Sequence, residues 1–324
     1  MTAEISVMNR NAIALAADSA VTISGEEGPK IFTSANKIFQ LSKYEPVGIM
    51  MYQNTNFLGV PWETIIKNYR EYLGKKKFRS LNEYADNFIS YLESKESNFT
   101  EDQKIRDYEN KVASYYFGLL DNITNSFAEE IKEEGEISKE KISEIIDQII
   151  SDHYQFWKKA PLINSLKDRD GKVDQFEQNN KELIVKIKDE IFSKINITSA
   201  QSMKLTRIAL SLFTKSPKNQ ITDNYTGIVI AGYGDEEIFP SLKAFKIEGL
   251  LDDILKFSVE KKSSISTTKL SSVIPFAQGD MVHSFMNGIE PSFFQAIKRD
   301  LMDMVSKYPK IILDCVDEIS DEVK

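Results

Sequence analysis

The sequence has few residues of the kinds that form disulfides or bind metals. Its 324 residues include one cysteine, Cys315, and two histidines, His153 and His283. A single cysteine forms no disulfide within the chain, and such chains are typical of reducing compartments, so we expect a cytoplasmic protein. Zinc sites draw three or four ligands mainly from His and Cys, so we expect neither a metal nor a cofactor.

The sequence also lacks an excess of positive charge and long apolar runs. Its 49 Asp and Glu residues outnumber its 41 Lys and Arg residues, which gives a formal net charge of −8 at pH 7. Nucleic-acid binders need a basic surface, and we interpret the one compact basic stretch, GKKKFR at 74–79, as a loop, so we expect no nucleic-acid partner. No window approaches the ~18 consecutive apolar residues of a membrane-spanning helix, so we expect no membrane partner.

The sequence does contain enough apolar residues for a large core, because 41% of its residues are hydrophobic. Strand-like runs occur near both ends of the chain. They lie at 3–8, 12–17, 37–42 and 46–52, and again at 226–237, 241–249, 252–260 and 270–279. Amphipathic helices are predicted at 60–73, 202–213 and 291–308.

The middle of the chain has a different pattern. From about 75 to 200 it is charged, has helical periodicity and contains capping-box spacings. Strands on both sides of a helical segment predict one discontinuous core, made of 1–74 and 201–324, with an all-helical insertion at 75–200. The expected fold class is therefore α+β.

The first two strand-like runs predict a hairpin that brings Thr2 close to an acidic residue. The sequence NRN between them favours a turn. With the turn centred on Arg10, the numbers of opposed residues sum to about 20, so Thr2 is expected opposite Asp18. If Met1 is removed, Thr2 carries a hydroxyl and a free α-amine with a reference pKa of about 7.7–8.0, which supply a nucleophile and a general base in one residue.

Together these residues resemble a known family. Thr2, AIALAADS at 12–19 and NKIFQL at 36–41 are similar to the N-terminal signature of proteasome β-type subunits and their bacterial relatives, the N-terminal-nucleophile hydrolases. In that family an N-terminal Thr is followed sixteen residues later by an Asp, as Thr2 is by Asp18, and a Lys in the place of Lys37 opens a later strand. The resemblance implies a four-layer αββα sandwich interrupted by the helical insertion.

The resemblance also implies roles for particular residues. Thr2 is expected to be nucleophile and base, Lys37 to lower the proton affinity of the Thr2 hydroxyl through its positive charge, and Asp18 to orient Lys37 and keep it charged. The remaining expectations concern the surroundings of these three residues. They are an oxyanion donor at the backbone N–H of Asn54, a supporting loop at Gly279 and Asp280, and a substrate pocket near Val21 and Tyr52.

Three positions depart from the family pattern. The chain has QNT at 53–55 where the family has a glycine-rich turn, Ala20 where many relatives have Arg, and QGD at 278–280 where a Gly/Ser loop is expected. The nucleophile, Asp and Lys therefore match the family better than the residues that would support them.

These observations predict a threonine-type amide hydrolase, most simply a peptidase, acting on a peptide or a small amide. Relatives of this kind form rings, so the resemblance also implies a homo-oligomer. Two alternatives stay open. One is a catalytically silent scaffold or interaction protein that binds a partner protein through 75–200, and the other is a small-molecule amidohydrolase.

Overall fold

The computed structural model describes residues 3–25, 28–32, 35–167, 171–217, 224–277 and 279–322. Within them 54% of the chain is helical and 22% is strand, and the sheets are antiparallel, which confirms the predicted α+β class. None of the described helices is both long and apolar enough to cross a membrane.

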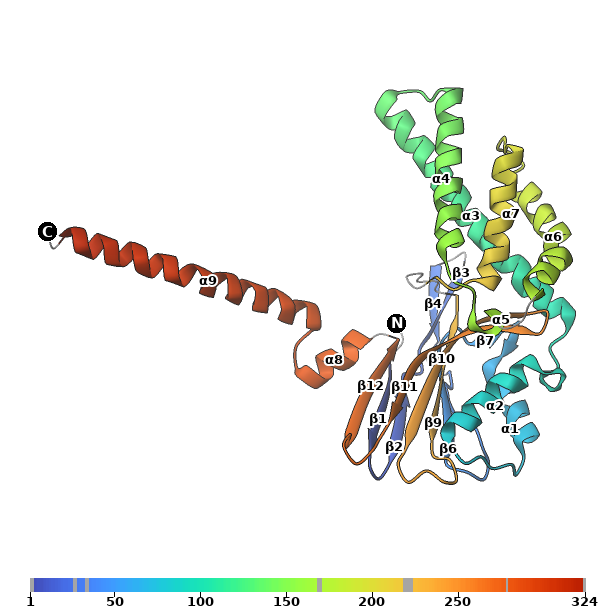
Figure 1. Cartoon of the computed structure of the whole chain (residues 1–324), viewed down its shortest axis with the longest axis horizontal. Coiled ribbons are helices and arrows are strands. Elements are labelled where there is room, and N and C mark those ends of the chain that lie inside the picture. Colours follow the sequence, from blue (N-terminus) through green and yellow to red (C-terminus); the bar gives the residue numbers. More distant parts are fainter. Residues whose placement is uncertain are drawn as a thin grey trace.

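A five-stranded antiparallel sheet forms the centre of the molecule (Figure 1). Its strands are, in spatial order, β11 (Ile254–Ser264), β10 (Ser241–Leu251), β9 (Thr226–Gly232), β6 (Val47–Gln53) and β5 (Ile38–Gln40). Strand β9 is buried along its whole length because its continuous apolar run, TGIVIAG, is covered on both faces.

A three-stranded sheet packs on one face of the central sheet. It consists of β12 (Ser271–Ala277), β1 (Ala3–Asn9) and β2 (Ile13–Ala17), in that order. Alternate residues of β1, namely Glu4, Ser6 and Met8, are buried and face the central sheet. Met8 packs there in an inter-sheet core with Met50, Tyr52, Val229, Ala231, Leu242, Ala244, Ile265 and Phe276.

The hairpin of β1 and β2 has a register one residue away from the expected one. Glu4 pairs with Ala17, so the numbers of opposed residues sum to 21. The side chain of Asn9 explains the shift, because its Oδ1 accepts the backbone N–H groups of Asn11 (2.8 Å) and Ala12 (2.9 Å) and closes a tight turn. Asp18 therefore lies opposite Ala3, and its backbone N–H donates to the Ala3 carbonyl. The predicted pairing of Asp18 with Thr2 is wrong by one position.

Two helices cover the other face of the central sheet. Helix α1 (Trp62–Leu73) and helix α2 (Leu81–Glu93) bury apolar residues at helical spacing against β6, β9 and β10. Helix α2 lies inside the stretch expected to be the insertion, yet it packs into this core, because Leu81, Tyr84 and Phe88 join the cluster of α1. Short elements connect these parts, namely β7 (Asn56–Phe57), β8 (Val60–Pro61) and the 3₁₀ turn η1 (Lys95–Ser97).

A separate helical unit stands at one end of the sandwich (Figure 1). It comprises α3 (Glu101–Glu134), α4 (Lys139–Lys159), α5 (Asn164–Lys167), α6 (Lys172–Ile191) and α7 (Ser199–Thr214). Apolar faces of α3, α4, α6 and α7 share one core, which includes Tyr108, Tyr116, Trp157 and Phe213. By packing, the helical unit therefore extends from α3 to α7, whereas the sequence-based boundaries are 75 and 200.

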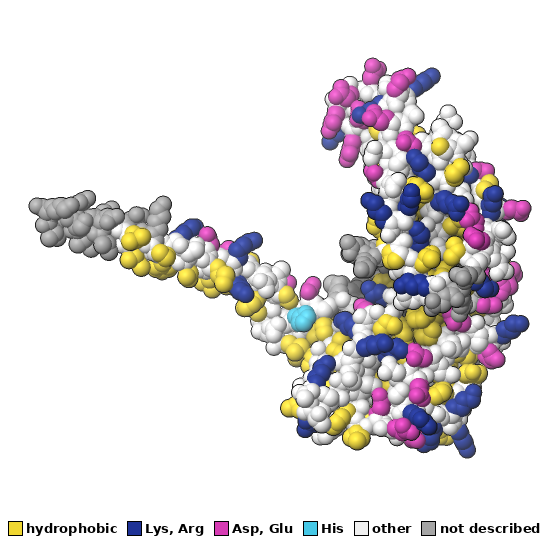
Figure 2. All heavy atoms as spheres, in the orientation of Figure 1, with side chains coloured by type: hydrophobic (Ala, Val, Ile, Leu, Met, Phe, Trp, Pro, Cys, Tyr) yellow, Lys and Arg dark blue, Asp and Glu magenta, His cyan; other side chains and the backbone are white. Residues whose placement is uncertain are grey.

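The outer face of the three-stranded sheet is apolar and partly exposed. Val7 of β1 is 44% exposed and Val273 of β12 is 38% exposed. Helix α8 (Gly279–Asn287) contacts β1 and β12, whereas α9 (Pro291–Glu322) projects away from the sandwich (Figure 1), with hydrophobic side chains along it (Figure 2). The described residues thus form three packed layers, and a fourth helical layer over this face stays a prediction.

Candidate functional site

Lys37 is the centre of a buried group of charged side chains. It precedes β5, and its carbonyl accepts the backbone N–H of Met51 at 2.9 Å, which fixes it against β6. Its side chain is almost fully buried and its ammonium pairs with the carboxylates of Asp18 and Glu4, the latter at 3.1 Å. An ammonium taken out of water is stable only when it is paired and hydrogen-bonded, and these two carboxylates meet that need.

Asp18 connects this ammonium to the N-terminal strand. One carboxylate oxygen binds Lys37, and the other accepts the backbone N–H of Ala3 at 3.0 Å. The backbone N–H of Asp18 donates in return to the Ala3 carbonyl at 3.2 Å. The structure therefore brings together Asp18 and Lys37, which the family resemblance had paired, and it does so beside the start of β1.

Thr2, the predicted nucleophile, lies outside the described residues, and it is joined in sequence to Ala3. The side chain of Val21, which begins β3 (Val21–Gly25), also lies outside the described part of the chain. Strand β3 pairs with β4 (Gly28–Phe32) in a separate two-stranded hairpin.

Glu4 is a member of the cluster that the sequence analysis did not identify. It is fully buried, and burial raises the pKa of its carboxyl to about 7 although the Lys37 ammonium acts in the opposite direction. Its Oε2, like Ser6 Oγ two residues along the same face, has no hydrogen-bond partner among the described residues. The alternation of β1 is the sequence pattern that could have identified Glu4. Residues 4, 6 and 8 lie on the same face of the strand, and Met8 belongs to the core, so Glu4 and Ser6 are polar residues on a buried face.

Tyr52 belongs to the inter-sheet core. It is buried, its ring packs near that of Phe276 at a centroid distance of 5.8 Å, and its hydroxyl donates to Glu260 of β11. Burial is the main cause that raises the pKa of this phenol far above its usual value. The structure therefore places Tyr52 behind Glu4, between the two sheets.

Gly279 and Asp280 begin α8 just after β12, and the last residue of that strand, Ala277, pairs with Ala3. Both are thus near the same end of β1 as Asp18. Ala277 has a φ of 52°, a left-handed value that is uncommon for a residue with a Cβ. Asp280 is exposed in the first turn of α8.

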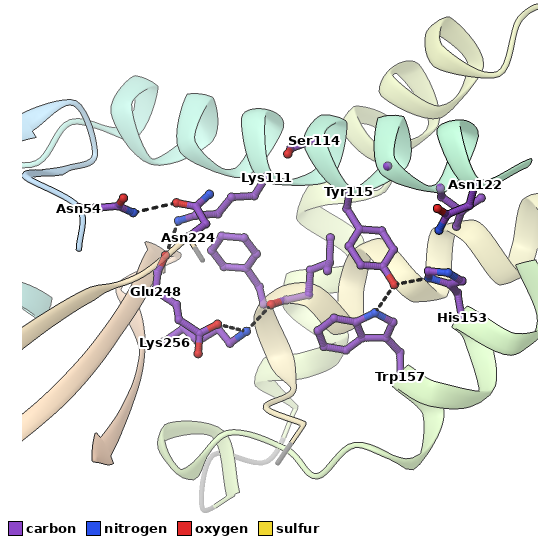
Figure 3. Close-up of a pocket in the computed structure, with 14 residues that line it drawn as sticks. Asn54, Lys111, Ser114, Tyr115, Asn122, His153, Trp157, Asn224, Glu248 and Lys256 are labelled. Carbon is purple, nitrogen blue, oxygen red and sulfur yellow. Dashed lines mark hydrogen bonds and ion pairs between the residues drawn. The ribbon is translucent and has the colours of Figure 1, made fainter. Parts of the chain in front are cut away.

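Asn54 lies just beyond the end of β6, at the turn where the resemblance predicts glycines. The preceding residue, Gln53, has a φ of 71°, so the backbone here does adopt a conformation that favours glycine. The backbone N–H of Asn54 donates to the Tyr225 carbonyl over a long 3.4 Å, and its side-chain amide donates to Asn224 Oδ1 at 3.1 Å (Figure 3). The proposed oxyanion donor is therefore engaged in a weak backbone hydrogen bond.

Comparison of this chain with protein-family models, with curated proteins and with solved structures finds no match. No group of three or more His, Cys, Asp or Glu residues in the described part of the chain is arranged to hold a metal ion. The candidate site therefore rests on the geometry around Lys37.

Proposed function

We propose that this protein is an N-terminal-nucleophile amide hydrolase that uses Thr2 after removal of Met1. The observation that carries the proposal is the double contact of Asp18, which binds both the buried Lys37 ammonium and the backbone N–H of Ala3. Ala3 follows Thr2 directly, so a positioned positive charge and the proposed nucleophile belong to one small region of the chain.

The chemistry follows from these groups. The α-amine of Thr2 accepts the proton of its own hydroxyl as the oxygen attacks an amide carbonyl. The positive charge of Lys37 stabilises the developing alkoxide, and Asp18 holds that ammonium in place. The amide C–N bond breaks, the amine leaves with the proton, and an ester to Thr2 remains. Water that gives a proton to the α-amine then hydrolyses the ester.

A four-layer sandwich and a homo-oligomer, with a peptide as the simplest substrate, belong to the same proposal. The apolar outer face of the three-stranded sheet supports a covering layer, since a sheet with two apolar faces is stable when both are covered.

A second candidate function is a catalytically silent scaffold that binds a partner through the helical unit. The specific observation in its favour is the backbone N–H of Asn54, which already donates to Tyr225 rather than pointing at a free position for an oxyanion. In this alternative Lys37 has a structural role only, as the partner of Glu4 and Asp18.

Intact-protein mass spectrometry after incubation with peptide epoxyketones distinguishes the two. The reagent closes a ring with both the α-amine and the hydroxyl of an N-terminal Thr. Wild type is expected to lack Met1 and to gain one adduct, Thr2→Ala to gain none, and Asp18→Asn to react more slowly. The matched control is Thr124→Ala, which removes a threonine on α3 and is expected to react like wild type. Retention of Met1, or a free Thr2 without adduct over several epoxyketones, would contradict the hydrolase proposal.

A further inference from the structure

A cavity of about 1040 Å³ separates the helical unit from the end of the central sheet (Figure 3). Helices α3, α4 and α7 form one side, and the ends of β10 and β11 with Asn54 and Asn224 form the other. This volume is at the upper end of the ~300–1,000 Å³ typical of ligand sites. Lys37, Asp18 and Glu4 do not line the cavity, whereas Asn54, the expected oxyanion donor, does, so the cavity lies beside the proposed catalytic centre without including its charged cluster.

One end of the cavity is lined by three ring side chains that are joined by hydrogen bonds. Trp157 Nε1–H donates to the Tyr115 hydroxyl at 2.8 Å, and that hydroxyl lies 2.7 Å from His153 Nδ1. The indole only donates to this hydroxyl, and which of Tyr115 and His153 donates in the second hydrogen bond depends on the tautomer of the His153 ring. Burial lowers the pKa of His153, which keeps the ring neutral near pH 7. Figure 3 shows these three side chains converging from α3 and α4.

The other end of the cavity carries two ammonium groups. Lys111 donates to the Glu248 carbonyl and to Asp107 (2.5 Å), and Lys256 donates to Glu248 Oε2 (2.6 Å) and to the Leu212 carbonyl (2.7 Å). An ammonium has three N–H donors. The ammonium groups of Lys111 and Lys256 each have two acceptors within the described part of the chain, so each has one further N–H for a ligand.

The lining is therefore rich in hydrogen-bond donors. Of the described residues that line the cavity, Lys111 and Lys256 are cationic and Glu248 alone is a carboxylate. Asp107, which pairs with Lys111 from outside the lining, brings the formal charge of this group to zero. The N–H donors that remain on the two ammonium groups, rather than a net positive charge, favour a ligand with acceptor oxygens such as an organic anion.

Gly118 keeps the middle of the cavity open. It lies in the interior of α3, where glycine destabilises a helix by roughly 0.5–1 kcal/mol relative to alanine. Its packing does not require glycine, because a Cβ there would meet no atom within 4 Å. The space that a side chain at position 118 would occupy is therefore part of the cavity.

We propose that this cavity binds an organic anion with an aromatic or aliphatic body, such as a carboxylate. The anionic group pairs with the remaining N–H donors of Lys111 and Lys256. The apolar body lies along Gly118 against Tyr115, Trp157 and Phe213. The site is independent of whether Thr2 is a nucleophile.

A matched pair of fluorescent probes tests the proposal, namely 1-anilinonaphthalene-8-sulfonate and its neutral counterpart N-phenyl-1-naphthylamine. The chain has two tryptophans, so Trp62→Phe leaves Trp157 in the cavity wall as the only donor for energy transfer to the dye. The sulfonate is expected to quench Trp157 emission with a Kd at least tenfold below that of the neutral probe. Lys256→Met removes one charged hydrogen bond to the ligand and is expected to raise the Kd of the sulfonate about 10- to 100-fold. Lys111→Met replaces this variant if Lys256→Met does not fold, and the same increase is expected. Either substitution leaves the Kd of the neutral probe within about twofold.

Gly118→Leu places a leucine side chain in the part of the cavity next to Gly118 and is expected to raise the Kd of both probes at least tenfold. Its matched control is Ala128→Leu, which adds the same side chain at an exposed position of α3 and is expected to bind like the parent. Equal Kd values for the two probes, or Kd values that Gly118→Leu leaves unchanged, would overturn the proposal, since the dye would then be bound elsewhere or without its charge.

Discussion

Replacing Glu4 by Gln tests whether a buried carboxyl with a raised pKa lies beside Lys37. The pKa of Glu4 is raised from 4.5 to about 7, mainly by burial. The folded protein then holds this proton more tightly than the unfolded chain does. As pH rises above 4.5 the unfolded carboxyl ionises first, so the free energy of unfolding falls until pH passes about 7. One pKa unit corresponds to about 1.4 kcal/mol, which makes the full decrease about 3 kcal/mol.

Glutamine keeps the shape and the acceptor oxygen of the protonated acid but does not ionise. Glu4→Gln is therefore expected to match wild type within about 1 kcal/mol near pH 5 and to be more stable by about 3 kcal/mol near pH 8. Titrating groups that do not interact with Glu4 are common to both proteins, so their contributions cancel in the difference, whereas Lys37 and Asp18 titrate together with Glu4.

The measurement is urea unfolding near pH 5 and near pH 8, followed by the fluorescence of Trp62 in a Trp157→Phe background. Trp62 is fully buried in the core between the central sheet and α1, so it reports on the sandwich rather than on the helical unit. Glu129→Gln, at an exposed position of α3, is the control and is expected to show no pH-dependent difference. A difference for Glu4→Gln that is the same at both pH values, or that favours wild type near pH 8, would refute the reasoning.

Four further substitutions give three predictions of direction and size. Gly118→Ala is expected to raise the free energy of unfolding of the helical unit by about 0.5–1 kcal/mol. Gly227→Ala is expected to lower the free energy of unfolding of the sandwich by more than about 2 kcal/mol, because its Cβ would overlap the ring of Tyr52. Urea unfolding of the two variants measures both effects, and equal effects in the two would contradict the prediction. Lys37→Met leaves Glu4 and Asp18 without their cation and is expected to cost about 3–5 kcal/mol in the same assay, so a loss below 1 kcal/mol would be evidence against a buried ion pair. Thr100→Ala removes the capping box of α3 and is expected to cost about 1 kcal/mol, seen as a lower melting temperature by Trp157 fluorescence; an unchanged melting temperature would contradict that role for the cap.

Local patterns in the sequence predict the elements of this fold better than they predict its packing. The continuous apolar run of β9, the helical stripe of α1 and the capping box before α3 are local signals, and each element forms where its signal lies. The register of the first hairpin depends on one side chain, Asn9, which a symmetric turn centre does not take into account.

Packing depends on contacts between distant segments. Helix α2 has the same amphipathic pattern as the helices of the helical unit, and only its burial against the central sheet assigns it to the sandwich. The cavity likewise has no sequence signature, because its walls come from three helices and two strand ends that are far apart in the chain. The pairing of Asp18 with Lys37 was expected from the family resemblance alone, and nothing in the spacing of the two residues would have predicted it.

The buried carboxyl of Glu4 connects the stability of the site to the chemistry proposed for it. With Asp18 and Lys37 both charged, a protonated Glu4 leaves the cluster neutral, and an ionised Glu4 gives it a net charge of about −1. If Thr2 is the nucleophile, a net negative cluster opposes the alkoxide that forms on its hydroxyl, so the attack is favoured while Glu4 holds its proton. The α-amine of Thr2 has the opposite requirement, because it acts as a base only when unprotonated. The burial that raises the pKa of Glu4 to about 7 therefore widens the pH range in which both conditions hold.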